Sequence, residues 1–271
     1  MKRGPVLVPL VVVVLALAGA AAGAGPSAGI VFGSPGVVSH DGKMRYLAVR
    51  AGSGTLVESV TTDGGALRRS RYLRGSYGIP LVAYDGKTAG LARNGRRLVL
   101  YSADGPGRPQ TRFVVLDPAT LRVRSRFSLN GSFGFDALSP DGSLMYLIQL
   151  KGQSGDYAVR ALNVATGRLY PGSIVDRREP DEKMTGIPMG RVGSGDGSWA
   201  YTLYVRPEKS PFVHALHTTH REAFCIDLPL RMPPDGLDHA RLRRAGSKLV
   251  VRLAGKTIAT VDTKTLKVTR T

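Results

Sequence analysis

Ser139-Pro140-Asp141-Gly142-Ser143-Leu144-Met145-Tyr146 is the clearest copy of a recurring pattern, in which an apolar strand directly follows a tight turn. An Asp-Gly or Asn-Gly pair between such runs is the strongest short-range signal for a β-hairpin. The five copies of the turn stand at Asp41-Gly42, Asn94-Gly95, Asp141-Gly142, Asp196-Gly197 and Ala245-Gly246, with spacings of 53, 47, 55 and 49 residues. A fixed period of this length predicts a repeat architecture.

A second signature follows later in each unit, and its best copy is Leu162-Asn163-Val164-Ala165-Thr166-Gly167. Residues 116–121 and 261–266 match it closely, residues 216–221 form a degenerate copy, and residues 61–65 form a looser one. Asp and Asn side chains accept hydrogen bonds from the backbone just ahead of them, which favours a turn. Each unit is therefore predicted to hold four strands, joined by two tight turns and one variable loop.

Four antiparallel strands per repeat of this length are typical of a β-propeller blade. The segments 139–146 and 162–167 resemble the YVTN-type and related bacterial β-propeller repeats, and the resemblance covers about residues 36–271. It implies an all-β propeller, for which we expect five four-stranded blades. A β-sandwich of similar strand count is the alternative. The resemblance leaves the activity open, because such propellers serve as scaffolds, binders and enzymes.

The first 24 residues have the pattern of a signal peptide. Lys2 and Arg3 precede an apolar run from Val6 to Ala22, and Ala22-Gly23-Ala24 matches a small-residue cleavage site. We expect cleavage to leave residues 25–271 as a single propeller domain, secreted or held at the cell envelope. An uncleaved leader acting as a membrane anchor is the alternative, because the run is close to the length of a spanning helix.

The chain is strongly basic, with 38 Lys and Arg against 20 Asp and Glu and a formal charge of +18. Part of the excess lies on predicted outermost strands, as at Arg122, Arg124 and Arg126, where cations discourage pairing between sheet edges. The remaining field should attract polyanions such as cell-wall polymers, acidic polysaccharides or anionic lipid head groups. No nucleic-acid recognition module is evident, so we expect no specific nucleic-acid binding.

The longer connections of every blade should lie on the rim opposite the tight turns. Loops on a rigid scaffold often carry binding sites, so we expect the ligand surface on this rim, around the channel mouth. The candidate residues are Tyr77, Tyr84, Phe133, Phe135, Asp136, Arg191, Asp238 and His239. Plain loop or core packing is the alternative for each. Asp136 and Arg191 precede their turns by five residues, and we favour an ion pair between them over a ligand contact.

No catalytic signature is recognisable, since the sequence has no G-x-S-x-G elbow, phosphate loop or H-E-x-x-H motif. Asp136 and Asp238 are the only plausible channel-side acids for a hydrolase or lactonase, which is the alternative function. His214, His217 and His220 suggest a metal site, but strand residues three apart point to opposite faces. We therefore expect neither a metal nor a cofactor.

Two further features are predicted to be structural. Cys225, the single cysteine, stands between Phe224 and Ile226 in a strand and should be buried and inert. The long insert 171–190 carries many charges and is predicted to be a solvated loop. Together these observations favour a non-catalytic binding or scaffold protein, whose partner is an anionic polymer or another envelope protein.

Overall fold

The computed structural model describes residues 25–102, 110–152, 155–206, 209–230 and 239–271. Their regular elements are β-strands, which confirms the expected all-β class. None of their segments forms a helix with the length and hydropathy of a membrane span. The predicted signal peptide and the candidate Asp238 lie outside these residues.

The strands form five sheets that follow the chain order. Sheet 1 contains β2 (Val37–Val38), β3 (Met44–Ala51), β4 (Gly54–Thr61) and β5 (Leu67–Arg74). Sheet 2 contains β7 (Leu98–Tyr101), β8 (Gln110–Leu116) and β9 (Val123–Asn130). Sheet 3 contains β10 (Phe133–Leu138), β11 (Leu144–Lys151), β12 (Asp156–Asn163) and β13 (Arg168–Leu169). Sheet 4 contains β14 (Ile187–Gly193), β15 (Trp199–Arg206), β16 (Lys209–His217) and β17 (Glu222–Asp227). Sheet 5 contains β18 (Ala240–Ala245), β19 (Lys248–Leu253), β20 (Lys256–Asp262) and β21 (Val268–Arg270). A two-stranded pair joins β1 (Ile30–Val31) to β6 (Ile79–Pro80).

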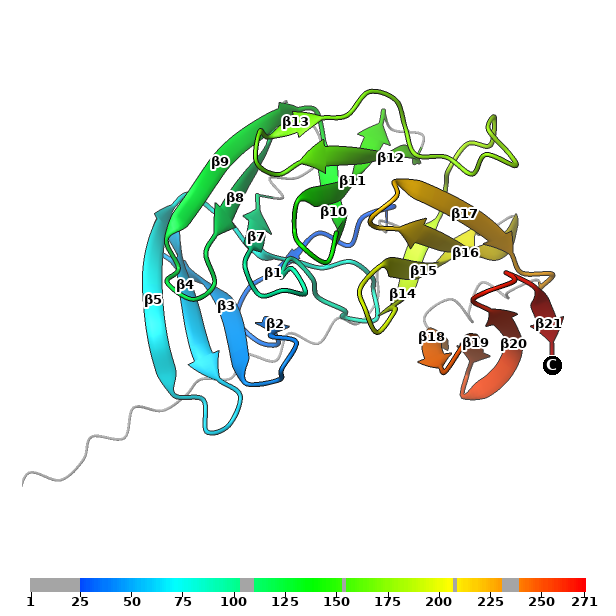
Figure 1. The fold of residues 1–271 in the computed structure, drawn as a ribbon, viewed down its shortest axis with the longest axis horizontal. Coiled ribbons are helices and arrows are strands. Elements are labelled where there is room, and N and C mark those ends of the chain that lie inside the picture. The colour runs from blue at the N-terminus through cyan, green and yellow to red at the C-terminus, as the bar shows by residue number, and fades with distance from the viewer. Residues whose placement is uncertain (1–24, 103–109, 153–154, 207–208, 231–238) are drawn as a thin grey trace, which may run out of the picture.

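The sheets are arranged around a centre, with the first strand of each innermost and the last outermost (Figure 1). This is a β-propeller, and it excludes the alternative of two sheets stacked face to face. In sheet 2 the innermost place is taken by a short segment, where Leu91 bridges to Leu98 and the Val99 N–H donates to the Gly90 carbonyl at 2.7 Å. The count of five four-stranded blades stays a prediction.

The predicted Asp-Gly turns are closed by their own side chains. Asp41 Oδ1 accepts a hydrogen bond from the Ser39 hydroxyl at 2.6 Å and from the Lys43 N–H at 3.1 Å, and Gly42 has a φ of 73°. The same pattern occurs at Asp141 and Asp196. Each turn therefore fixes the register between the innermost strand and the next.

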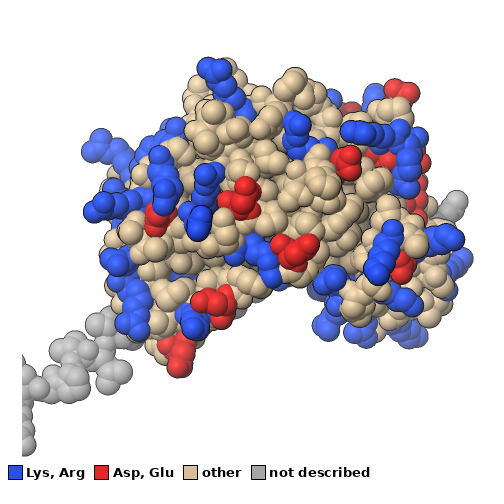
Figure 2. All heavy atoms as spheres, viewed as in Figure 1, with Lys and Arg blue, Asp and Glu red and all other residues tan. Residues whose placement is uncertain are grey.

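Alternating strand residues build the core between neighbouring sheets. Four hydrophobic clusters fill the spaces between sheets 1 and 2, 2 and 3, 3 and 4, and 4 and 5. Within the described ranges no such cluster joins sheet 5 to sheet 1. The sheets thus form an arc, and the outline of the molecule is notched between these two sheets (Figure 2). We call this space the opening.

The face of sheet 1 toward the opening is partly apolar. This face carries three exposed apolar side chains, Val38, Leu67 and Tyr72, with exposed fractions of 41%, 57% and 51%. Their cross-strand partners are Arg45, Val60 and Leu56, respectively. In a closed propeller a neighbouring sheet would bury such residues.

The insert 171–190 differs from the predicted solvated loop. Ile174 bridges to Val159 of sheet 3 and Met184 to Tyr157, so the insert runs along the outer part of that sheet. Asp176 is buried, and its carboxylate binds the Arg178 guanidinium and accepts the Cys225 N–H of sheet 4 at 2.8 Å. The charged segment of the insert is therefore only partly exposed, because Asp176 is buried where it joins the insert to sheet 4.

Candidate functional site

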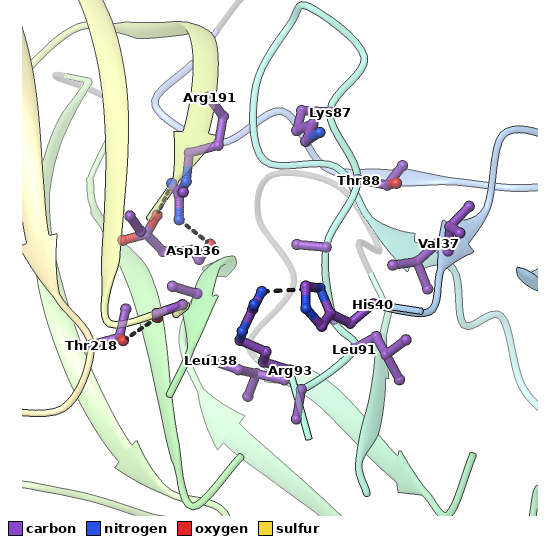
Figure 3. A pocket seen from close by; sticks show the side chains of 18 of the residues that line it. Val37, His40, Lys87, Thr88, Leu91, Arg93, Asp136, Leu138, Arg191 and Thr218 are labelled. Atoms are coloured by element: carbon purple, nitrogen blue, oxygen red, sulfur yellow. Dashed lines mark hydrogen bonds and ion pairs between the residues drawn. The ribbon is translucent and has the colours of Figure 1, made fainter. Parts of the chain in front are cut away.

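A cavity of about 510 Å³ lies at the centre of the arc. It is lined mainly by the innermost segments of sheets 1 to 4, with Arg45 from β3 and Thr218 after β16, and Figure 3 shows many of its side chains. The charged residues of the lining are Arg45, Lys87, Arg93, Arg191 and Asp136. Among the described residues that line this central cavity, four cations accompany one carboxylate.

Asp136 and Arg191 form the predicted ion pair on one wall of the central cavity (Figure 3). Arg191 Nη1 is 2.6 Å from Asp136 Oδ1 and also donates to the Thr202 hydroxyl at 2.6 Å, while its Nη2 donates to the Asp136 carbonyl at 2.8 Å. Both side chains are buried, with exposed fractions of 3% for Asp136 and 8% for Arg191. Asp136, whose carboxylate is the only one among the described lining residues, is therefore neutralised by a neighbouring cation.

The other three cations have no carboxylate partner among the described ion pairs. Arg93 Nη1 lies 3.0 Å from His40 Nδ1, and Arg45 Nη1 donates to the Pro35 carbonyl at 2.7 Å. Lys87 is exposed at the end of a tight turn. In Figure 3 Arg93 and His40 lie together on the wall away from the Asp136–Arg191 pair. These side chains keep donors available for an anion.

Asp85 fixes the segment that carries Lys87 to sheet 4. The Oδ1 atom of Asp85 accepts a hydrogen bond from the Lys87 N–H at 3.0 Å, and its Oδ2 atom accepts one from the backbone N–H of Arg191 at 3.2 Å. The neighbouring Tyr84 N–H donates to the Pro188 carbonyl of β14 at 2.8 Å. The long connection between sheets 1 and 2 thereby reaches sheet 4 and places Lys87 at the cavity.

The sequence-predicted candidates are dispersed, apart from Asp136 and Arg191. Tyr77 is buried in the core between sheets 1 and 2, and Phe133 and Phe135 are buried in the core between sheets 2 and 3. Tyr84 is 40% exposed, and its hydroxyl donates to the Ser27 carbonyl at 3.5 Å. His239 is exposed beside the first strand of sheet 5, and Asp238 lies outside the described residues.

Sequence reasoning missed His40, Arg45, Lys87 and Arg93 as cavity residues. A signal for two of them was present, because His40 and Arg93 directly precede the Asx residue of their tight turns. Residues at that repeat position stand at the inner end of each sheet, and Pro140 also lines the cavity there. Arg45 and Lys87 gave no such signal.

The histidine and cysteine side chains considered in the sequence pack against other residues of sheet 4. His214 is buried beside the Tyr204 ring, and burial lowers its pKa to about 4. The rings of His217 and His220 stack at 4.1 Å across a turn, on a different part of sheet 4. Burial raises the pKa of Cys225 to about 12, so its thiol stays protonated and weakly nucleophilic.

Comparisons with known proteins support the fold and nothing finer. No family model and no curated protein sequence matches the chain. A functionally unknown protein from Desulfotomaculum acetoxidans superposes with a TM-score of 0.51 at 10% identity, covering 87% of this chain and 67% of that one. Hydrazine synthase of Kuenenia stuttgartiensis gives 0.50 at 17% identity, covering 86% and 70%. The Swd1 β-propeller domain of Myceliophthora thermophila gives 0.49 at 12% identity, covering 88% and 67%. At these identities the similarity concerns the fold alone.

Proposed function

We propose that this protein is an exported, non-catalytic binding protein that holds an anionic group in its central cavity. The observation that carries the proposal is the cavity lining, with four cations and a single carboxylate that one of those cations already neutralises. A partly enclosed cavity with cations on several walls concentrates anions, since its low-dielectric walls focus the field.

The sequence supports a location outside the cytoplasm. The basic start, apolar run and small-residue site of residues 1–24 have the pattern of an export signal. The YVTN-type resemblance of the repeats agrees with a scaffold whose loops and channel bind a partner. With a formal charge of +18, the natural ligands are anionic polymers of the cell envelope.

The carboxyl groups of the cavity favour a binding function over hydrolysis. Hydrolysis of a glycosidic bond requires two carboxyl groups that face one cleft. Of the described residues that line the cavity, Asp136 alone carries a carboxyl group, and its Oδ1 is taken by Arg191. The described lining therefore lacks the second carboxyl group that this hydrolysis requires.

The test is calorimetric titration of the purified mature protein with inorganic phosphate and with poly(glycerol phosphate). Arg93→Gln is expected to weaken both interactions by about tenfold, because a hydrogen bond to a charged group contributes about 1.5–3 kcal/mol. Arg168→Gln, which removes an exposed cation from the outer edge of sheet 3, is the matched control and should leave both affinities unchanged. Equal affinities of the wild type and Arg93→Gln would refute the proposal.

A further inference from the structure

Sheet 5 carries a disproportionate share of the positive charge. Residues 239–271 contain nine Lys and Arg and a single acid, Asp262. Figure 2 shows Lys and Arg side chains gathered over the lobe that sheet 5 forms. Arg243, Lys248 and Arg252 take part in none of the ion pairs found between described residues.

Strand alternation sorts these side chains onto one face. Leu242, Leu249 and Val251 are buried against sheet 4, so the residues that alternate with them point toward the opening. Those residues include four cations, which we call the basic face: Arg241, Arg243, Lys248 and Arg252. Arg243 and Lys248 are exposed.

The cations of the basic face form a row along the strands. Arg241 and Arg243 are two residues apart on β18, a separation of about 7 Å. Arg252 lies directly opposite Arg241 in register, and Lys248 lies at the other end of β19. Like charges that share one face of a sheet repel each other, so an anion lying beside Arg243 and Lys248 would relieve their repulsion.

The opening connects the basic face with the central cavity. Val38 and Arg45 of sheet 1 point toward the opening, and both also line the cavity. Figure 1 shows sheet 5 and sheet 1 on the two sides of the opening. A ligand that lies in the opening can therefore contact the basic face at one end and Arg45 of the cavity at the other.

We propose that the opening admits a linear polyanion, which lies along the basic face and reaches the central cavity at Arg45 and Arg93. This inference rests on the proposed function and names its ligand as an extended chain with regularly spaced negative charges. The concave position of the face favours this occupant, because a thin chain enters a notch between two sheets, whereas a planar bilayer does not. A small anion fills the cavity without touching the basic face.

The experiment compares poly-L-glutamate with inorganic phosphate as titrants of the mature protein. The double variant Arg243→Gln/Lys248→Gln should bind poly-L-glutamate about tenfold more weakly and keep the wild-type affinity for phosphate. The slope of log affinity against log salt should also become shallower, since fewer counterions are released on binding. The matched control is Arg122→Gln/Arg168→Gln, which removes the same charge from the outer edges of sheets 2 and 3 and should bind both titrants normally.

The outcomes separate this inference from the proposed function. Unchanged binding of both titrants by Arg93→Gln contradicts the proposed function. Wild-type binding of poly-L-glutamate by Arg243→Gln/Lys248→Gln, or an equal loss in the control double variant, overturns the inference alone. Binding to phosphatidylglycerol vesicles as strong as to the polymer, or a stable dimer in light scattering that masks the basic face, also overturns it.

Discussion

At the scale of single residues, one position explains why the second turn of each repeat has a loose sequence. Asp117, Asn163 and Asp262 each accept backbone hydrogen bonds with Oδ1, and His217 takes the same place with Nδ1 near the Thr219 and His220 N–H groups. The residue that closes the turn has a positive φ in all four copies, namely Leu121, Gly167, Arg221 and Leu266. The turn tolerates different residues here because the Asx-type acceptor holds the backbone.

Gly167 tests this position. A Cβ at Gly167 would lie 2.9 Å from Phe127 Cβ of the neighbouring sheet, and its φ is 68°. Gly167→Ala is expected to lower the free energy of unfolding by about 2–3 kcal/mol, from overpacking and from the left-handed backbone together. Gly64→Ala is the control, because Gly64 has a φ of 70° and open space around it. It should cost only about 1 kcal/mol in urea denaturation, and equal effects would contradict the packing argument.

His214 predicts an acid sensitivity of the fold. Its pKa is lowered to about 4 by burial, so the unfolded chain binds a proton at a higher pH than the folded one. Stability should therefore fall as the pH drops from about 6.5 toward 4, by up to about 3 kcal/mol. Urea midpoints of the wild type and of His214→Gln, measured between pH 7.5 and 4.5, check this. The same decline in both proteins would show that His214 is not its origin.

At the scale of elements, the insert 171–190 behaves as a strap held by one buried acid. Asp176 side-chain exposure is 1%, and Arg178 binds it through both Nε and Nη2. Because Asp176 also accepts the Cys225 N–H, the insert depends on sheet 4 for its position.

Asp176→Asn removes the charge from this anchor. Since it leaves the half-exposed Arg178 guanidinium and the buried Cys225 N–H with a weaker acceptor, we expect a loss of about 2–3 kcal/mol in unfolding free energy. Proteolysis within residues 171–190 should also become faster. Asp181→Asn, at an exposed position of the same insert, should change neither quantity. Equal cleavage rates in the two variants would argue against the anchor.

At the scale of the whole molecule, the hydrophobic clusters join only neighbouring sheets, so the stability of the arc is close to a sum of interfaces. The connection that binds sheet 4 through Tyr84 and Asp85 adds to this sum. The Asp136–Arg191 pair links sheets 3 and 4 at the cavity wall. Asp136 Oδ2 has no hydrogen-bond partner there, which makes the pair a costly element of the core.

Breaking the pair should therefore be worse than removing it. Asp136→Asn leaves Arg191 buried without its counterion, and we expect a loss of about 3–5 kcal/mol in unfolding free energy. Asp136→Leu/Arg191→Met should recover most of this loss, because apolar side chains of similar volume avoid the desolvation cost. Chemical denaturation of the wild type, Asp136→Asn and the double variant measures these differences in stability. A double variant less stable than Asp136→Asn would contradict this account.

The sequence by itself determined the repeat, the strands, the turns and the Asp136–Arg191 pair, because hairpin signals and strand alternation act over a few residues and recur at one spacing. It also determined that Cys225 would be buried. Only the tertiary structure decided that Tyr77, Phe133 and Phe135 are core residues, that Asp176 anchors the insert, and that His40, Lys87 and Arg93 meet at one cavity. The opening between sheets 5 and 1 could not be predicted from the sequence either. The physical reason is that the curvature of the whole arc decides which face of each sheet is buried, and no local sequence pattern encodes that curvature.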